Sequence, residues 1–343
     1  FGVAFFREMT DRVFRTDAEV ESRLQVNCLA MMPAIQSSGA GAPPDRRWSS
    51  KIAGVLKSVA LRPVEPRRSH SLGRRTHGAP SPAGPDTPGT PRLDEAASAS
   101  REISQAPGLL RHVLDLPFSQ FTEALRSLKV VIDLNGAVQA NKVIGVTSSI
   151  PNEGKSTIAA NLAELIAFSG ARTILVDADL RNPSLSRHFA PNADIGFVDI
   201  VSGRVERYAV LWKDTKSGLD FLPVGNAAKL MHSHDILGSE STKKLLAALR
   251  EDYDYVIVDF APLAPVVDTR ASSHFIDSYI YVVEWGRTQT DVVEHSLSVA
   301  HEIYDRLLGV VLNKADMNTL RRYDHYRSNY YYKKYYSRYG YTA

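Results

Sequence analysis

The stretch KVIGVTSSIPNEGKSTIAANLA, residues 142–163, organises the interpretation of the whole chain. Its first apolar residues predict a buried strand, its polar middle predicts a loop, and the apolar residues that follow at three- and four-residue spacing predict a helix. Residues 149–156 have the pattern S-x-x-x-x-G-K-S, a P-loop with serine in place of the first glycine. The stretch therefore predicts a strand, a phosphate-binding loop and a helix in succession.

The residue types in this loop suit a nucleoside triphosphate. Backbone N–H groups at a helix N-terminus attract anions, and the helix dipole adds partial positive charge. Gly154 lets the backbone approach a phosphate, Lys155 can reach the β- and γ-phosphates, and the Ser156 hydroxyl can bind Mg²⁺. The alternative, a chance match in an ordinary loop, is disfavoured because the motif lies between a strand and a helix. The expected nucleotide-binding residues of the loop are Ser149, Asn152, Glu153, Gly154, Lys155, Ser156 and Thr157.

Length and composition restrict the class of protein. The 343 residues can form one large domain or two ordinary ones, and the net charge of +3 says little about partners. The single cysteine, Cys28, excludes an internal disulfide framework and fits a reducing compartment. No apolar run is long enough to span a bilayer. However, residues 1–6 are apolar and arginines follow them, which is typical of the cytoplasmic end of a membrane helix; a frayed core strand is the alternative.

The composition changes along the chain and predicts four parts. Residues 1–36 are expected to hold the end of a membrane helix and a juxtamembrane segment with a charged helical pattern at 7–29. Residues 37–113 are rich in Pro, Gly, Ser and Arg, and we expect a disordered linker. Its basic residues could attract anionic lipids, but a solvated spacer is the favoured interpretation. A globular domain at 114–318 and a tyrosine-rich tail at 319–343 complete the chain.

Within the domain, strand and helix patterns alternate. An amphipathic helix is predicted at 118–131, before the P-loop unit. This alternation predicts an α/β fold of the P-loop NTPase type, with a mostly parallel sheet and helices on both faces. The other predicted strands are 172–177, 219–224, 255–259, 278–283 and 308–312, and the other predicted helices are 239–250 and 291–307.

Carboxylates follow two of these strands, at the sheet edge where open parallel sheets bind ligands. Asp177 and Asp179 end one strand, and Arg181 beyond them is expected to contact the nucleotide. Asp259 ends another strand in a Walker-B pattern, so Asp177 and Asp259 are expected near Mg²⁺. Either Asp177 or Asp179 can accept the proton of a hydroxyl nucleophile, and the sequence leaves that choice open. Asp268 is an equally good candidate for a structural role and for positioning water or metal.

Residues 312–316, LNKAD, resemble the N-K-x-D motif with which GTPases recognise the base. Asn313 follows a strand and can hydrogen-bond a purine edge, although so short a motif is weak evidence for guanine.

The tail from residue 321, RRYDHYRSNYYYKKYYSRYGYTA, combines tyrosines with basic residues. Three functions fit this composition: stacking on single-stranded nucleic acid, anchoring at a membrane interface, and accepting phosphoryl groups. Beside a triphosphate site, the third is favoured, because a flexible hydroxyl can reach a γ-phosphate. The expected phosphoacceptors are Tyr323, Tyr326, Tyr330, Tyr331, Tyr332, Tyr335, Tyr336, Tyr339 and Tyr341.

Together these motifs resemble those of the bacterial tyrosine kinases (BY-kinases) of the polysaccharide co-polymerase class, especially exopolysaccharide (succinoglycan-type) transport proteins. The resemblance covers about residues 114–343, with Walker A at 149–156, Walker A′ at 174–181, Walker B at 256–262 and the tyrosine cluster. The juxtamembrane segment FREMTDRVFRT, residues 6–16, is also similar. The family's E-x-x-R-x-x-R oligomerisation motif falls on Glu123, Arg126 and Lys129, where lysine replaces the last arginine and weakens the inference.

The resemblance implies an ATP- and Mg²⁺-dependent tyrosine autokinase that phosphorylates tails in trans within a ring-like homo-oligomer. It implies control of the polymerisation, chain length and export of a polysaccharide, with the export machinery and a tyrosine phosphatase as partners. It also implies a bacterial inner-membrane protein, attached through a part missing from this sequence, whose present portion is cytoplasmic.

Three other functions account for fewer of these motifs. Partitioning-type ATPases share the sheet but carry a signature lysine where this chain has Ile150, and they do not usually end in tyrosines. A GTPase switch leaves residues 177–181 and the tail unexplained. A nucleic-acid-binding module leaves the P-loop without a purpose, so nucleic acid is an improbable partner.

Overall fold

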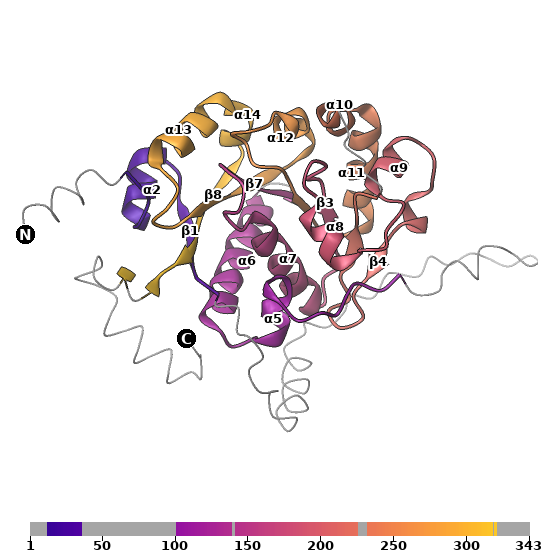
Figure 1. The fold of residues 1–343 in the computed structure, drawn as a ribbon, viewed down its shortest axis with the longest axis horizontal. Coiled ribbons are helices and arrows are strands. Elements are labelled where there is room, and N and C mark those ends of the chain that lie inside the picture. The colour runs from indigo at the N-terminus through magenta and orange to yellow at the C-terminus, as the bar shows by residue number, and fades with distance from the viewer. Residues whose placement is uncertain (1–11, 36–100, 139–140, 226–231, 318, 321–343) are drawn as a thin grey trace, which may run out of the picture. The chain divides into compact units, whose positions relative to one another are not determined.

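The computed structural model describes residues 12–35, 101–138, 141–225, 232–317 and 319–320 (Figure 1). Most of the predicted linker at 37–113, namely residues 37–100, and the tail tyrosines lie outside these residues, so both stay predictions. Among the described residues, no helix combines the length and the apolar content needed to cross a bilayer.

An eight-stranded sheet forms the centre of the described domain, in the order β1-β8-β7-β2-β6-β3-β5-β4. Neighbouring strands are parallel, except that β4 is antiparallel to β5. The strands are β1 (Cys28–Pro33), β2 (Val143–Ser148), β3 (Thr173–Asp177), β4 (Trp212–Lys213), β5 (Asp220–Leu222), β6 (Tyr255–Asp259), β7 (Ser278–Glu284) and β8 (Leu307–Ala315).

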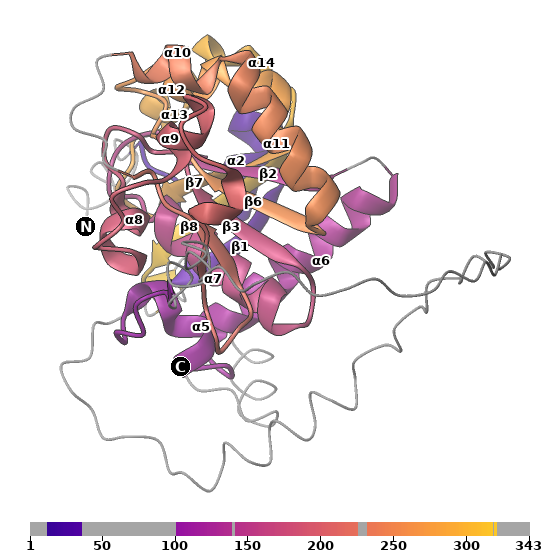
Figure 2. The ribbon, with the colours of Figure 1, turned by 90° about the vertical axis from the view of Figure 1, so that its right-hand side faces the viewer.

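Helices cover both faces of the sheet, as Figures 1 and 2 show. Successive strand residues alternate between two cores: Val256 and Val258 face one, and Ile257 between them faces the other. The helices are α2 (Asp17–Leu24), α5 (His112–Asp115), α6 (Gln120–Val138), α7 (Lys155–Phe168), α8 (Ser184–Phe189), α9 (Phe197–Val201), α10 (Ser233–Leu237), α11 (Glu240–Asp252), α12 (Asp268–Ala271), α13 (Thr290–Val299) and α14 (His301–Tyr304), with short 3-10 turns at Leu109–Arg111, Arg207–Ala209 and Ser273–Phe275. The predicted α/β class is confirmed.

The N-terminal part of the chain differs from the prediction. Within the helical pattern at 7–29, the described residues 12–29 form the short helix α2, which Thr16 caps and for which Glu19 completes a capping box. After α2 the chain forms β1, which pairs with β8 at the edge of the sheet. Residues 12–35 are therefore part of the globular domain, and the charged pattern alone did not reveal this.

The predicted start of the domain at residue 114 is also too late. Ile103 and Arg111 are buried, and Ile103 N–H donates a hydrogen bond to the carbonyl of Lys213. Residues 101–113 thus pack on the domain, although their composition resembles that of the linker. The predicted helix at 291–307 is in fact two helices, α13 and α14, separated at Ala300.

Candidate nucleotide-binding site

The P-loop connects the end of β2 to the start of α7, at the carboxyl edge of the sheet. Asn152 and Gly154 both have left-handed backbones, with φ of 71° and 96°. A Cβ on Gly154 would lie 2.1 Å from the Asn313 side-chain nitrogen. Glycine is thus required here both by the backbone angle and by the close packing of β8.

Glu153 shapes this loop from inside the protein. Its buried carboxylate accepts hydrogen bonds from Ile150 N–H at 2.7 Å, Glu284 N–H at 3.1 Å and the Thr288 hydroxyl at 2.6 Å. Burial raises the pKa of Glu153, and these hydrogen bonds oppose that rise. Glu153, expected to contact the nucleotide, thus uses its side chain for hydrogen bonds within the chain.

Asn313 holds the loop from the opposite side. Its amide nitrogen donates to the carbonyl of Glu153 at 2.8 Å, and its side chain is buried at the end of β8. Behind the loop, the Ser149 hydroxyl lies 2.9 Å from the Tyr281 hydroxyl. Asn313 therefore supports the P-loop in this structure, and its recognition of a purine stays a prediction.

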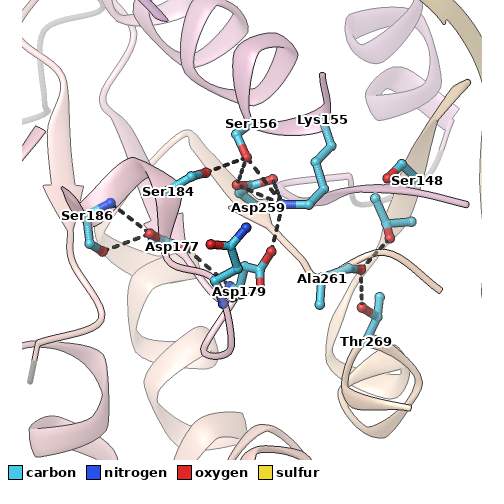
Figure 3. Close-up of polar contacts among 12 residues, drawn as sticks. Ser148, Lys155, Ser156, Asp177, Asp179, Ser184, Ser186, Asp259, Ala261 and Thr269 are labelled. Carbon is cyan, nitrogen blue, oxygen red and sulfur yellow. Dashed lines mark hydrogen bonds and ion pairs between the residues drawn. The ribbon is translucent and has the colours of Figure 1, made fainter. Parts of the chain in front are cut away.

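Lys155, the first residue of α7, lies among carboxylates (Figure 3). Its Nζ is 2.9 Å from Asp179 Oδ2 and 3.4 Å from both oxygens of Asp259. Burial by itself would lower the pKa of Lys155, but Asp259 and Asp179 outweigh burial and raise this pKa. The lysine is therefore charged and held at the sheet edge.

The Ser156 hydroxyl connects three elements of the site (Figure 3). It donates a hydrogen bond to Asp259 Oδ2 at 2.6 Å and accepts one from the Ser184 hydroxyl at 3.0 Å. Lys155 Nζ also donates to it, at 3.2 Å. Sequence patterns did not identify Ser184, because only the fold brings the start of α8 to the P-loop.

Asp177 and Asp179 have different surroundings. Asp177 Oδ2 accepts hydrogen bonds from the backbone and hydroxyl of Ser186, both at 2.8 Å, and Asp177 Oδ1 accepts one from Asp179 N–H. Asp177 lies opposite Asp259 in the register of β3 and β6. Burial and the Asp259 charge raise the pKa of Asp177 to about 7. Asp177 thus fixes the start of α8, whereas Asp179 faces Lys155.

The charges at this edge suit a divalent cation. Asp177, Asp179 and Asp259 are all buried, and the buried cation beside them is Lys155. Burial raises the pKa of Asp259 as well, because it disfavours the charged carboxylate, and Lys155 opposes that rise. The described residues contain no preformed group of three or more metal-binding side chains. Such a site fits Mg²⁺, which commonly takes few protein ligands and completes its shell with phosphates and water.

Arg181 and Asp268 form a separate pair. Arg181 Nε and Nη2 donate to the two oxygens of Asp268 at 2.7 and 3.0 Å, and the Ser233 hydroxyl donates to Asp268 at 2.7 Å. Asp268 therefore has a structural contact that joins the loop after β3 to α10 and α12. Thr157, also a predicted site residue, lies half-buried in the first turn of α7.

The predicted oligomerisation residues lie on α6 and make contacts within their own chain. Glu123 pairs with Arg126 at 2.8 Å, and Arg126 also donates to the carbonyl of Pro117. Lys129 pairs with Asp133 at 2.6 Å. Their role between chains stays a prediction.

Known proteins resemble this chain in sequence. A family model described as an AAA domain matches residues 141–307. The succinoglycan biosynthesis transport protein ExoP of Rhizobium meliloti is 40% identical over 250 residues, which cover 73% of this chain and 31% of ExoP. The putative tyrosine-protein kinase EpsB of Ralstonia solanacearum is 30% identical, over 68% of this chain and 30% of EpsB. The chain belongs to the bacterial tyrosine-kinase family.

Solved structures agree with this family in fold. The kinase domain of the Escherichia coli tyrosine kinase ETK has a TM-score of 0.60 and 19% identity, covering 87% of this chain and 92% of that domain. The chimerical protein CapA2B2 has a TM-score of 0.61 and 22% identity, covering 87% of this chain and 99% of that protein. The chain spans about 31% and 30% of the length of ExoP and EpsB, respectively.

Proposed function

We propose that this BY-kinase chain is an ATP- and Mg²⁺-dependent tyrosine autokinase that phosphorylates its own tail tyrosines in trans. The observation that carries the proposal is the convergence of Lys155, Ser156 and the carboxylates Asp177, Asp179 and Asp259 at one sheet edge. Phosphoryl transfer needs positioning and charge stabilisation more than covalent catalysis, and this cluster supplies both.

The residues of the site have separate roles in this proposal. Lys155 exchanges its carboxylate contacts for the β- and γ-phosphates of ATP. Ser156 and Asp259 would hold the Mg²⁺, which would neutralise charge on the phosphates. Asp179 is better placed than Asp177 to accept the tyrosine proton, because Ser186 already donates two hydrogen bonds to Asp177 Oδ2. Asp177 remains near the metal and keeps α8 in place.

The wider function follows from the family. ExoP is named a succinoglycan biosynthesis transport protein, and EpsB a putative tyrosine-protein kinase. By analogy, tail phosphorylation here controls the polymerisation, chain length and export of an exopolysaccharide, and a tyrosine phosphatase reverses it. This portion then lies on the cytoplasmic side of a bacterial inner membrane and works within a homo-oligomer.

The test places the active site and the phosphate-accepting tail on two different chains. A chain ending at residue 320 keeps the proposed site but lacks the tail, and full-length Lys155→Met keeps the tail but lacks the essential lysine. Mixed with labelled ATP and Mg²⁺, the pair should label tail tyrosines of the Lys155→Met chain, while that chain alone should show no label. Lys213→Met, which changes an exposed lysine, serves as the matched control and should keep wild-type labelling.

Three results would each contradict a part of the proposal. Tail labelling of Lys155→Met alone, at the wild-type rate, would place the active site elsewhere. Hydrolysis of ATP by the wild type without any labelled tyrosine would favour a partitioning-type ATPase. Stronger competition by GTP than by unlabelled ATP at equal concentration would overturn the choice of nucleotide.

A further inference from the structure

The hydrogen bonds around Ser156 use its whole bonding capacity. A serine hydroxyl has one hydrogen to donate and two lone pairs that accept. Here the hydrogen goes to Asp259, and the lone pairs accept from Ser184 and Lys155. In this state the Ser156 oxygen has no lone pair left for a metal ion.

Nucleotide binding releases one of these lone pairs. In the proposed function, on which this inference rests, Lys155 moves to the phosphates of ATP and gives up Ser156. Around the tetrahedral oxygen, the O–H bond then points to Asp259 and one lone pair accepts from Ser184. The remaining lone pair points in the one direction that these two partners leave.

We propose that Ser184 is a positioning residue for the metal: its hydroxyl orients Ser156 so that the free lone pair meets Mg²⁺. Ser184 does not itself touch the metal. Partners that orient a metal ligand in this way commonly change metal affinity by about 10- to 100-fold when removed.

The local structure supports a role for Ser184 outside its own helix. It is the first residue of α8, and its hydroxyl donates to Ser156 rather than to a group of its own helix; the N-cap residue Pro183 makes no side-chain cap hydrogen bond. Helix α8 is instead anchored by Ser186, which hydrogen-bonds Asp177 and accepts a hydrogen bond from Val224 N–H at 2.9 Å. Removing the Ser184 hydroxyl should therefore leave α8 in place and affect mainly Ser156.

The experiment measures metal binding apart from catalysis. Binding of Mn²⁺ to the ADP-saturated full chain is followed by the electron paramagnetic resonance signal of free Mn²⁺. Binding of a fluorescent ADP analogue in EDTA gives nucleotide affinity without metal. The variants are Ser184→Ala, Ser184→Thr, which keeps a hydroxyl, and Ser202→Ala, which removes an exposed hydroxyl bonded to a helix carbonyl elsewhere.

We expect Ser184→Ala to raise the Mn²⁺ dissociation constant about tenfold while metal-free ADP binding stays at the wild-type level. Ser184→Thr should restore most of the Mn²⁺ affinity, and Ser202→Ala should match the wild type. Unchanged Mn²⁺ affinity in Ser184→Ala would overturn the inference. So would an equal loss of metal-free ADP binding, because that would mean a general disturbance of the loop. A wild-type chain that bound no nucleotide would instead overturn the proposed function, and this inference with it.

Discussion

Several residues of this site have structural roles that their sequence motifs did not predict. Glu153 and Asn313 were expected to contact nucleotide, but their side chains stabilise the loop that surrounds the phosphate. Ser184 belongs to no motif, yet it donates a hydrogen bond to Ser156. The P-loop of this chain is thus held in shape by residues from β7, β8 and α8.

The conformation of the P-loop does not accommodate a side chain at Gly154. Gly154→Ala should weaken binding of a fluorescent ATP analogue at least about tenfold, since a left-handed backbone costs an L-residue about 1–2 kcal/mol and the new Cβ would clash with Asn313. Adding Asn313→Ala removes the clash but not the backbone cost, so the double variant should recover affinity only in part. Wild-type affinity in Gly154→Ala would show that the loop has a different conformation.

At the level of elements, the P-loop helix α7 also carries a buried charge cluster at its far end. Glu164 of α7 lies 3.1 Å from Arg111, and Arg111 also pairs with Asp214 before β5. Asn161 of α7 donates to the carbonyl of Leu109 and accepts from Val113 N–H. These contacts fasten residues 109–113 to the helix that begins at the phosphate site.

Glu164 should make stability depend on pH. Burial raises the pKa of Glu164 to about 8, so the folded state binds its proton more tightly than the unfolded state, in which the pKa is near 4.5. The stability associated with this proton is present below pH 4.5 and is lost as the pH rises through 8. Glu164→Gln should therefore reduce the fall in Tm between pH 5 and pH 8.5 by about 4 °C. Thermal unfolding at the two pH values measures this, with the exposed Glu240→Gln as control. Equal falls in Tm for Glu164→Gln and the wild type would contradict the prediction.

The edge strand β1 should contribute to stability as well. The segment before β1 accepts hydrogen bonds from Trp285 Nε1 at Arg15 O and from the Tyr304 hydroxyl at Leu24 O, both at 2.8 Å. Removing residues 1–35 would expose these groups and the edge of β8, so we expect a Tm lower by at least about 5 °C and more aggregation. Removing only residues 1–11 is the control and should change the Tm little. A Tm for the longer deletion that matched this control would show that β1 adds nothing.

At the scale of the whole molecule, the residues predicted to join neighbouring chains make ion pairs within their own chain. The pairs Glu123–Arg126 and Lys129–Asp133 both lie on α6. If these residues also join neighbouring chains, Lys129→Arg should strengthen assembly, because a guanidinium binds a carboxylate with two parallel hydrogen bonds.

Sedimentation velocity of the full chain tests this expectation. Glu123→Ala combined with Arg126→Ala should shift the population to monomers, whereas Glu240→Ala combined with Lys243→Ala, which removes a similar pair from α11, should not. An assembly that all these variants leave unchanged would assign the interface to another surface.

The P-loop, the alternating strands and the carboxylates after them were predictable from the order of residues, because backbone periodicity and loop chemistry are local. The structure confirms β2, β3, β5, β6, β7 and β8 at or near the expected places. The separate surroundings of Asp177 and Asp179 were not predictable, since they depend on Ser186 and Lys155.

The sequence did not predict that two segments, residues 12–35 and 101–113, belong to the globular domain. Their charged or proline- and glycine-containing patterns resemble a juxtamembrane segment and a linker, yet β1 pairs with β8 and Arg111 inserts between Glu164 and Asp214. The same holds for Ser184, which meets the P-loop only because α8 is anchored beside it. Contacts between residues so far apart in the chain leave no periodic signal, and only the packed fold reveals them.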